Sequence, residues 1–300
     1  MSRKKRRRKR HKAAVNRKGK DKVFCFIFGN ERNRKWTLSL YNAVNDSHYE
    51  DESQILFNGL QDYLYLSIKN DVSFIIADSM NLYEHQSTFN PNMPLRMMRY
   101  AGNLYGKYVD ENDLDVYGED LLELPVPKLV VFYNGKKDAP DETILRLSDS
   151  FKSEHGGKSD IEVKVRMLNI NYGHNAELLQ KCRPLYEYSW FIDRVREYNK
   201  SMEIEQAVGK AIVEMPEDFE IRAFLKSNQA EVSNMLTAEY HEINALDLVA
   251  RANKKKGREE GRKVGREEGL AEGKKERESL KRENERLREE IENLRAALAK

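Results

Sequence analysis

The chain has 300 residues, which is enough for one sizeable α/β domain with a hydrophobic core. Of these residues, 39% are hydrophobic and 34% charged, so part of the chain is expected to lie in solvent. Its two cysteines, Cys25 and Cys182, have no zinc-ligand spacing and are too few for a disulfide framework, which is typical of a reducing, cytoplasmic location. No apolar run reaches the roughly 20 residues that span a bilayer, and no hydrophobic segment follows the basic N-terminus as in a secretory signal. A membrane partner is therefore not expected.

The net charge of +3 hides a strong asymmetry along the chain. Residues 1–22 contain thirteen Lys or Arg and one acid, so they carry +12 and the remaining residues carry −9. Residues 1–20 are expected to form a disordered basic arm, because this run repels itself and has no apolar face to bury. Such an arm suits salt-sensitive, sequence-independent contact with nucleic-acid phosphates, and a solvated tail is the alternative. The candidate nucleic-acid ligands in the arm are Arg3, Lys4, Lys5, Arg6, Arg7, Arg8, Lys9 and Arg10.

Residues 21–170 have the pattern of an α/β domain. Apolar residues at helical spacing predict a helix over residues 31–44, whereas residues 55–68 fit either a short helix or a strand. Two β segments are predicted at 71–77 and 81–87, joined by a polar turn at 78–80. A helix is predicted to begin at Pro94. Strands are predicted in "PVPKLVVFYNG" and in "IEVKVRMLNI", the second with one face in solvent.

The C-terminal part reads as helical, with a helical region at 171–253 interrupted at Pro216. In residues 254–276 a glycine recurs every four residues between charged triplets. Each glycine costs about 1 kcal/mol relative to alanine in a helix, so the sequence favours a flexible spacer over a helix packed against a second helix. The spacing of apolar residues in 277–300 predicts a short two-stranded parallel coiled coil and hence a homodimer, the alternative being an amphipathic helix folded back on its own domain. Its two seam positions are occupied by Leu280, Leu287 and Leu294 and by Asn284, Ile291 and Leu298.

Two acids in the predicted hairpin could hold a divalent metal ion. Asp71 begins the first β segment and Glu84 lies in the second, so an antiparallel hairpin brings them to one end of the sheet. Because side chains alternate along a strand, Gln86 shares the face of Glu84, while His85 points the other way and could offer a metal only its backbone carbonyl. Mg²⁺, or Mn²⁺ in its place, prefers such oxygen ligands. The alternative is an ordinary strand with a polar end.

The helix that follows the hairpin carries two arginines, Arg96 and Arg99. They would extend beside the acids and could hold phosphates of a nucleic acid. Ordinary surface arginines on an amphipathic helix are the alternative.

Five segments occur in the order seen in a known family: "LSLYNAVN", "KNDVSFII", "NLYEHQSTFNPNMPLRMMRY", "LPVPKLVVFYNG" and "LRLSDSF". Over about residues 21–155 the chain resembles the Rpn-type recombination-promoting nucleases, also described as PD-(D/E)xK nuclease family transposases. The resemblance implies a restriction-endonuclease-like mixed sheet flanked by helices, with metal-dependent DNA cleavage in recombination or mobile DNA. It matches Asp71 to the metal-binding aspartate, Glu84 to the second acid, and Gln86 to the position of a lysine in the wider superfamily. Glutamine there is usual within this group.

A neutral amide at residue 86 can still orient water, but it cannot stabilise charge as an ammonium does. We therefore expect a slow DNA endonuclease that uses Mg²⁺ or Mn²⁺, has little sequence preference and needs no small-molecule cofactor. One alternative is a catalytically silent protein that binds DNA and dimerises. Another is a nuclease directed at RNA.

Overall fold

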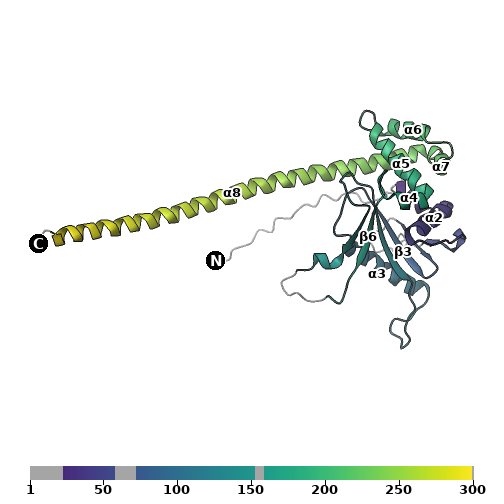
Figure 1. The fold of residues 1–300 in the computed structure, drawn as a ribbon. Helices are drawn as coiled ribbons and strands as arrows, with labels where there is room; N and C mark the ends of the chain where they lie inside the picture. The colour runs from purple at the N-terminus through teal and green to yellow at the C-terminus, as the bar shows by residue number, and fades with distance from the viewer. Residues whose placement is uncertain (1–22, 58–71, 153–158, 299–300) are drawn as a thin grey trace, which may run out of the picture. The chain divides into compact units, whose positions relative to one another are not determined.

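The computed structural model describes residues 23–57, 72–152 and 159–298. Within these ranges, six strands form one mixed sheet in the order β1-β2-β3-β4-β6-β5 (Figure 1). The three central strands β3, β4 and β6 run parallel, and the outer strands pair antiparallel to their neighbours. The strands are β1 (Leu56–Phe57), β2 (Val72–Ile76), β3 (Ser79–Gln86), β4 (Val126–Tyr133), β5 (Glu142–Arg146) and β6 (Lys164–Asn169).

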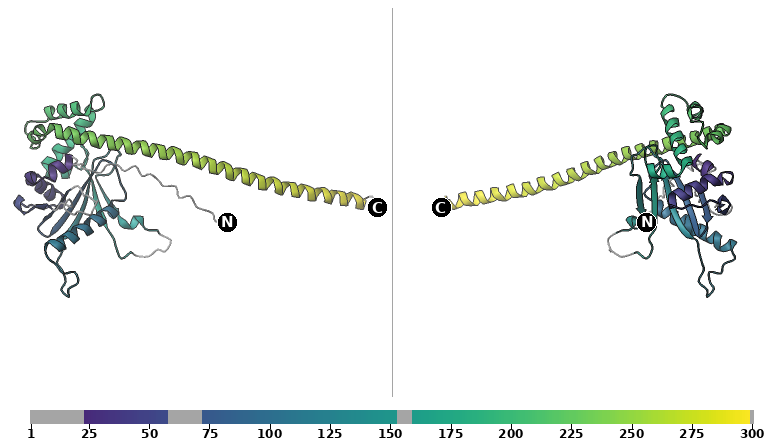
Figure 2. Two further views of the ribbon diagram at one scale, coloured as in Figure 1. Left: turned by 180° about the vertical axis from the view of Figure 1, so that it is seen from behind. Right: turned by 45° about the vertical axis from the view of Figure 1, so that its right-hand side comes forward.

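Helices cover both faces of the sheet. Among the described helices, α3 packs against one face, and α1, α2, α4 to α7 and the start of α8 pack against the other. In every view α5, α6 and α7 gather over the same end of the sheet (Figures 1 and 2). The helices are α1 (Val23–Phe28), α2 (Arg34–Asn45), α3 (Met93–Glu111), α4 (Ala176–Lys181), α5 (Arg183–Tyr198), α6 (Ile204–Glu214), α7 (Arg222–Ser227) and α8 (Gln229–Leu298), with short 3₁₀ turns at Glu31–Asn33, Glu52–Gln54 and Leu147–Ser150.

The predicted α/β class is confirmed, and so are the two β segments before α3. β2 and β3 form an antiparallel hairpin in which Ile76 pairs with Ser79. The turn begins one residue earlier than expected, at Ala77, which adopts a left-handed conformation with φ of 47°. This conformation closes the chain within two residues. Helix α3 begins with Met93 and has Pro94 in its first turn, where the missing N–H needs no partner.

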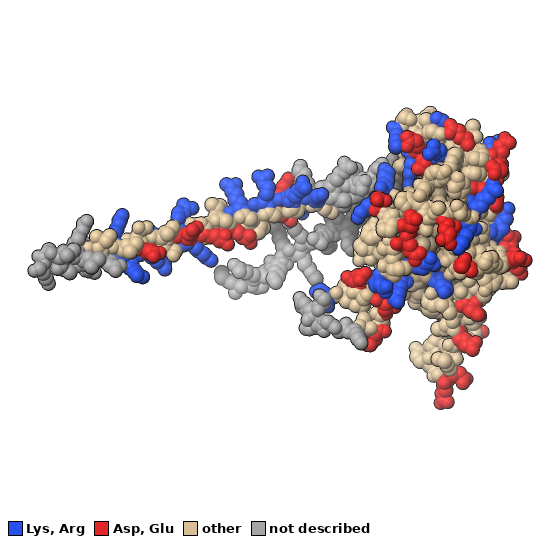
Figure 3. Space-filling model, in the orientation of Figure 1, with Lys and Arg blue, Asp and Glu red and all other residues tan. Residues whose placement is uncertain are grey.

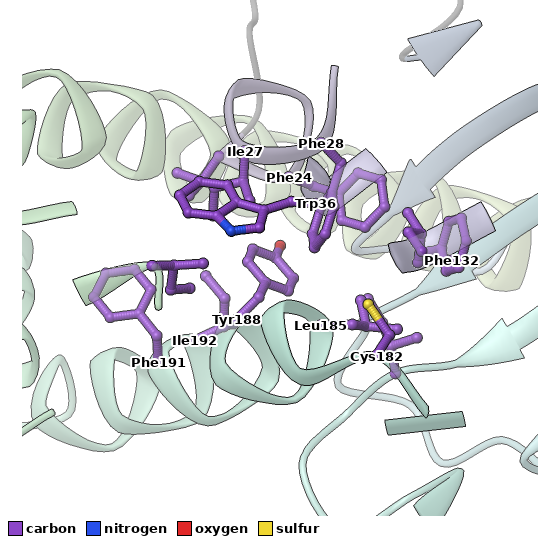
Figure 4. Close-up of a cluster of buried hydrophobic side chains, with 14 of the residues drawn as sticks. Phe24, Ile27, Phe28, Trp36, Phe132, Cys182, Leu185, Tyr188, Phe191 and Ile192 are labelled. Carbon is purple, nitrogen blue, oxygen red and sulfur yellow. The ribbon is translucent and has the colours of Figure 1, made fainter. Parts of the chain in front are cut away.

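The helices after β6 share a core with the sheet. Aromatic and aliphatic side chains of α1, β4 and α5 interdigitate in it, among them Phe24, Phe132 and Phe191 (Figure 4). The hydrophobic core therefore continues past residue 170 into the helical region. One compact unit runs over Met1–His241, and Glu242–Lys300 form a second.

Two strands differ from the expectation. β5 was not predicted, because it is a short edge strand in which Leu145 is the buried residue and the other positions are partly or fully exposed. In β6 the solvent-facing side is limited to Lys164 and Arg166, since Leu168 on the same side is buried. This strand lies between β4 and β5, and its end is covered on both faces.

The expected glycine-rich spacer is instead part of α8. Residues 254–276 are helical throughout, and nothing lies within 4 Å of a Cβ added at Gly257, Gly261, Gly265, Gly269 or Gly273. Lys, Arg and Glu between the glycines are good helix formers, and pairs one turn apart such as Lys256 and Glu260 offset part of the glycine cost. Acidic and basic side chains alternate along this second unit (Figure 3). None of the described helices is long and apolar enough to cross a membrane.

Replacement of Glu187 tests how α5 is held in the core. Its side chain is fully buried and accepts hydrogen bonds of 3.0 Å from Arg183 Nε and from the backbone N–H groups of Glu220 and Ile221. Glu187→Ala leaves these donors without an acceptor, so we expect the free energy of unfolding to fall by about 2–4 kcal/mol, measured by urea denaturation. Glu197→Ala, at an exposed ion pair with Lys200 on the same helix, is the control and should change little. Equal losses in both variants would contradict this account.

Candidate active site

The two polar side chains singled out on β3 both face α3. Glu84 contacts Arg96 of α3, and Gln86 contacts Met93 at the start of the same helix. Their neighbour Tyr83 belongs to the core on the opposite face. The expected alternation of faces is therefore present, and β3 brings Glu84 and Gln86 together under α3.

Glu84 is almost fully buried, with 3% of its surface exposed. Arg96 Nη2 donates a hydrogen bond to Glu84 Oε1 and forms an ion pair with it. The same guanidinium donates to the Tyr100 hydroxyl from Nε at 3.2 Å and from Nη2 at 2.9 Å, and lies 5.7 Å from the centre of that ring. A buried carboxylate is costly without a countercharge. Arg96 supplies that countercharge, and its contact with a phosphate stays a prediction.

Gln86 is buried beside Glu84 with its amide in a fixed orientation. Its Nε2 donates to Met93 Sδ at 2.6 Å, and its Oε1 has no hydrogen-bond partner among the described residues. A buried acceptor left without a donor costs roughly 1–3 kcal/mol. The arrangement therefore places an unsatisfied amide oxygen next to a carboxylate, both of which are hard oxygen donors.

The side chain of His85 belongs to the core and not to the site. It stacks on Phe24 with ring centres 5.1 Å apart, and its Nε2 lies 3.0 Å from the Tyr188 hydroxyl (Figure 4 labels both aromatic partners). Burial raises the pKa of Tyr188 well above its ordinary value, so the hydroxyl stays protonated and is able to donate to His85. His85 could thus offer the site only its backbone carbonyl, as expected from the alternation of the strand.

The other predicted site residues lie either on the surface of α3 or outside the described residues. Arg99 is exposed on α3. Asp71 lies outside the described residues, immediately before β2 in the sequence, and the basic residues 3–10 also lie outside them. No group of three or more His, Cys, Asp and Glu side chains in the described ranges could hold a metal ion. The oxygen donors of Glu84, Gln86 and the His85 carbonyl fit Mg²⁺ in type.

Sequence reasoning missed the contacts that hold the loop after β4 against this site. Asn134 N–H donates to the Gln86 carbonyl at 2.8 Å, which ties the loop to the end of β3. Arg196 of α5 donates to Asn134 through Nη1, at 2.6 Å from Oδ1, and through Nη2 to its carbonyl oxygen. The motif "FYNG" marks the loop in the sequence, but Arg196 is 62 residues away and has no local signal.

Comparison with known proteins identifies the family. A family model described as "Putative transposase, YhgA-like" matches residues 55–216, which is 162 of the 300 residues. No curated protein matches the chain, and no solved structure does. The family description associates the chain with mobile DNA, in agreement with the resemblance in the sequence. The match covers more than half of the chain and includes β3, α3 and the loop after β4, so the protein belongs to the YhgA-like transposase family.

Proposed function

We propose that the protein is a metal-dependent DNA endonuclease, which hydrolyses phosphodiester bonds with low sequence specificity in recombination or in the movement of mobile elements. The observation that supports this most is the buried pair of Glu84 and Gln86, held side by side beneath α3 with an arginine on the carboxylate. A buried carboxylate beside an unsatisfied amide oxygen is costly for stability. Binding and catalysis at this position would account for that cost.

Each group has a role suited to its chemistry. Asp71 and Glu84 would hold Mg²⁺ or Mn²⁺ with the His85 carbonyl, and the ion would supply an activated water and stabilise charge at phosphorus. Gln86 would orient the attacking water, because an amide both donates and accepts hydrogen bonds. Arg96 neutralises Glu84 in the resting protein and holds its carboxylate in one orientation.

DNA is the proposed partner. The basic residues Arg3 to Arg10 would bind the phosphate backbone, and Arg99 on the surface of α3 would add a further contact near the site. Contacts to phosphates carry no sequence information, which accounts for the low specificity proposed.

A second copy of the chain is the proposed partner of the end of α8. In residues 277–300 the d positions hold Leu280, Leu287 and Leu294, and the a positions hold Asn284, Ile291 and Leu298, a combination that favours parallel pairs. The side chains of Leu280, Leu287 and Ile291 are about half exposed in the single chain. Glu283 at a g position would face Arg288 at an e position of the second helix, so opposite charges flank the seam.

The central experiment is plasmid nicking with added Mg²⁺ or Mn²⁺. We expect wild-type protein to nick the plasmid and Asp71→Ala to abolish nicking, because one carboxylate cannot hold the ion in place. Gln86→Lys should cleave as fast or faster, since an ammonium stabilises the developing charge. Cleavage products are measured on agarose gels, and the fold of each variant is checked by circular dichroism.

Two results would reject this proposal. Wild-type protein that binds plasmid with a steep salt dependence but never cuts it would favour a silent DNA-binding protein. Cleavage by Asp71→Ala at the wild-type rate would show that the proposed site does not carry out the cleavage. A matched RNA substrate, cut in preference to DNA, would redirect the proposal to RNA.

Removal of Arg96 should strengthen metal binding. Its guanidinium already occupies the Glu84 carboxylate, and a second cation must compete with it at close range. We expect Arg96→Met to lower the Kd for Mn²⁺ about tenfold, measured by calorimetric titration without DNA. Arg99→Met, an exposed arginine on the same helix, is the matched control and should bind Mn²⁺ as the wild type does. Unchanged or weaker binding by Arg96→Met would show that the two cations do not compete.

The dimer depends on the apolar seam of α8. Leu287→Asp places a charge in the seam, and we expect it to shift the protein to monomers in sedimentation analysis at micromolar concentration. Glu285→Ala, outside the seam on the same helix, should leave the association unchanged. A wild-type chain that is monomeric at all concentrations, or a dimer unaffected by Leu287→Asp, would argue against the pairing.

A further inference from the structure

The loop that joins β4 to β5 lies directly beside the end of β3. Gln86 pairs with Tyr133 in the parallel ladder, and the next residue of the loop, Asn134, donates its N–H to the Gln86 carbonyl at 2.8 Å. Neighbouring strands in a sheet lie about 5 Å apart. The first residues of the loop are therefore neighbours of Gln86.

Several contacts hold this loop in one conformation. The Tyr133 hydroxyl donates to the Lys137 carbonyl at 2.7 Å, and Asn169 Nδ2 donates to the Ala139 carbonyl at 2.7 Å. Gly135 is required, because a Cβ there would lie 2.4 Å from the Tyr133 hydroxyl oxygen. Burial raises the pKa of Tyr133, which keeps its hydroxyl protonated as a donor. The backbone around residue 137 is thus fixed from two strands.

The loop directs one lysine to the same face as Glu84 and Gln86. Tyr133 belongs to the core beneath α3, and Phe89, three residues after Gln86, packs against the same core. The Lys137 ammonium lies 5.5 Å from the centre of the Phe89 ring. Contact with the ring holds the ammonium over the segment that joins β3 to α3.

Lys137 has the chemistry that residue 86 lacks. Its side chain is exposed and carries a point charge on a flexible four-carbon stem, which suits contact with a phosphate. Gln86 is neutral, and Arg96 is engaged with Glu84. A positively charged side chain for a substrate phosphate at the site would therefore come from another element, in addition to the proposed metal ion.

We propose that Lys137 is a DNA-binding residue of the site, which contacts the phosphate backbone next to Gln86 and supplies there the positive charge that the glutamine does not. The assignment to DNA rests on the proposed endonuclease function. Lys136 precedes it in the same loop and is also exposed, but no ring contact within the described part of the chain places its ammonium beside β3. The two lysines therefore form a matched pair for a test.

The first measurement is the Kd of full-length protein for a short duplex DNA without divalent metal. It is determined by fluorescence anisotropy over a range of salt concentrations. Lys137→Met should raise the Kd three- to tenfold and reduce the slope of log K against log salt by about one, as for loss of one phosphate contact. Lys136→Met removes the same charge and should change the Kd less than twofold. Lys137→Arg keeps the charge and should bind as the wild type does. Equal effects of Lys136→Met and Lys137→Met would overturn the proposal.

The second measurement separates this proposal from the endonuclease itself. With Mg²⁺ and saturating DNA, Lys137→Met should cleave at least tenfold more slowly, and Gln86→Lys in the Lys137→Met background should restore cleavage. Wild-type protein that never cleaves, while Lys137→Met still binds DNA less tightly, would reject the endonuclease and leave the phosphate contact standing. Wild-type protein that cleaves, with Lys137→Met binding and cleaving at the wild-type level, would overturn the role of Lys137 and leave the endonuclease standing.

Discussion

The parallel pairing of β3 with β4 is the constraint on which the rest of the site depends. The two strands pair along their whole length, from Ser79 with Val126 to Gln86 with Tyr133. Parallel strands require cover on both faces, and β3 is accordingly buried on both sides. This burial forces Glu84 and Gln86 into the space beneath α3 and His85 into the opposite core, and it brings the loops after both strands to the same edge.

Burial then determines the electrostatics of that edge. A carboxylate beneath α3 needs a countercharge, and Arg96 provides it from within the same helix that covers the strand. The glutamine beside it adds no charge, so the buried part of the site contains one ion pair and one neutral amide. The loop after β4 presents two exposed lysines, Lys136 and Lys137, at the same edge.

The polar network around Arg196 explains how an exposed loop can be kept rigid. Its guanidinium donates to the side chains of Asn134 and Asn171, and Asn171 in turn donates to the Gly135 carbonyl at 3.1 Å. These bonds satisfy loop groups that would otherwise need water. The helix that carries Arg196 also carries Tyr188, the partner of His85, so α5 supports β3 from the far side and the loop from its end.

The periodicity of apolar and polar residues predicts much of the fold of this protein. It predicted the α/β class, the hairpin of β2 and β3, helix α3, and the sharing of one face by Glu84 and Gln86, because these depend on residues two to four apart in the chain. It missed β5, because a strand with one buried leucine has no alternating pattern. The prediction of a spacer at residues 254–276 was wrong, because the glycines were given more weight than the helix-forming residues between them. The partner of Glu84, the clamp of Arg196 on Asn134 and the position of Lys137 over Phe89 were decided only by the tertiary structure. Each of these contacts depends on how separate elements pack, and no local spacing in the sequence records that packing.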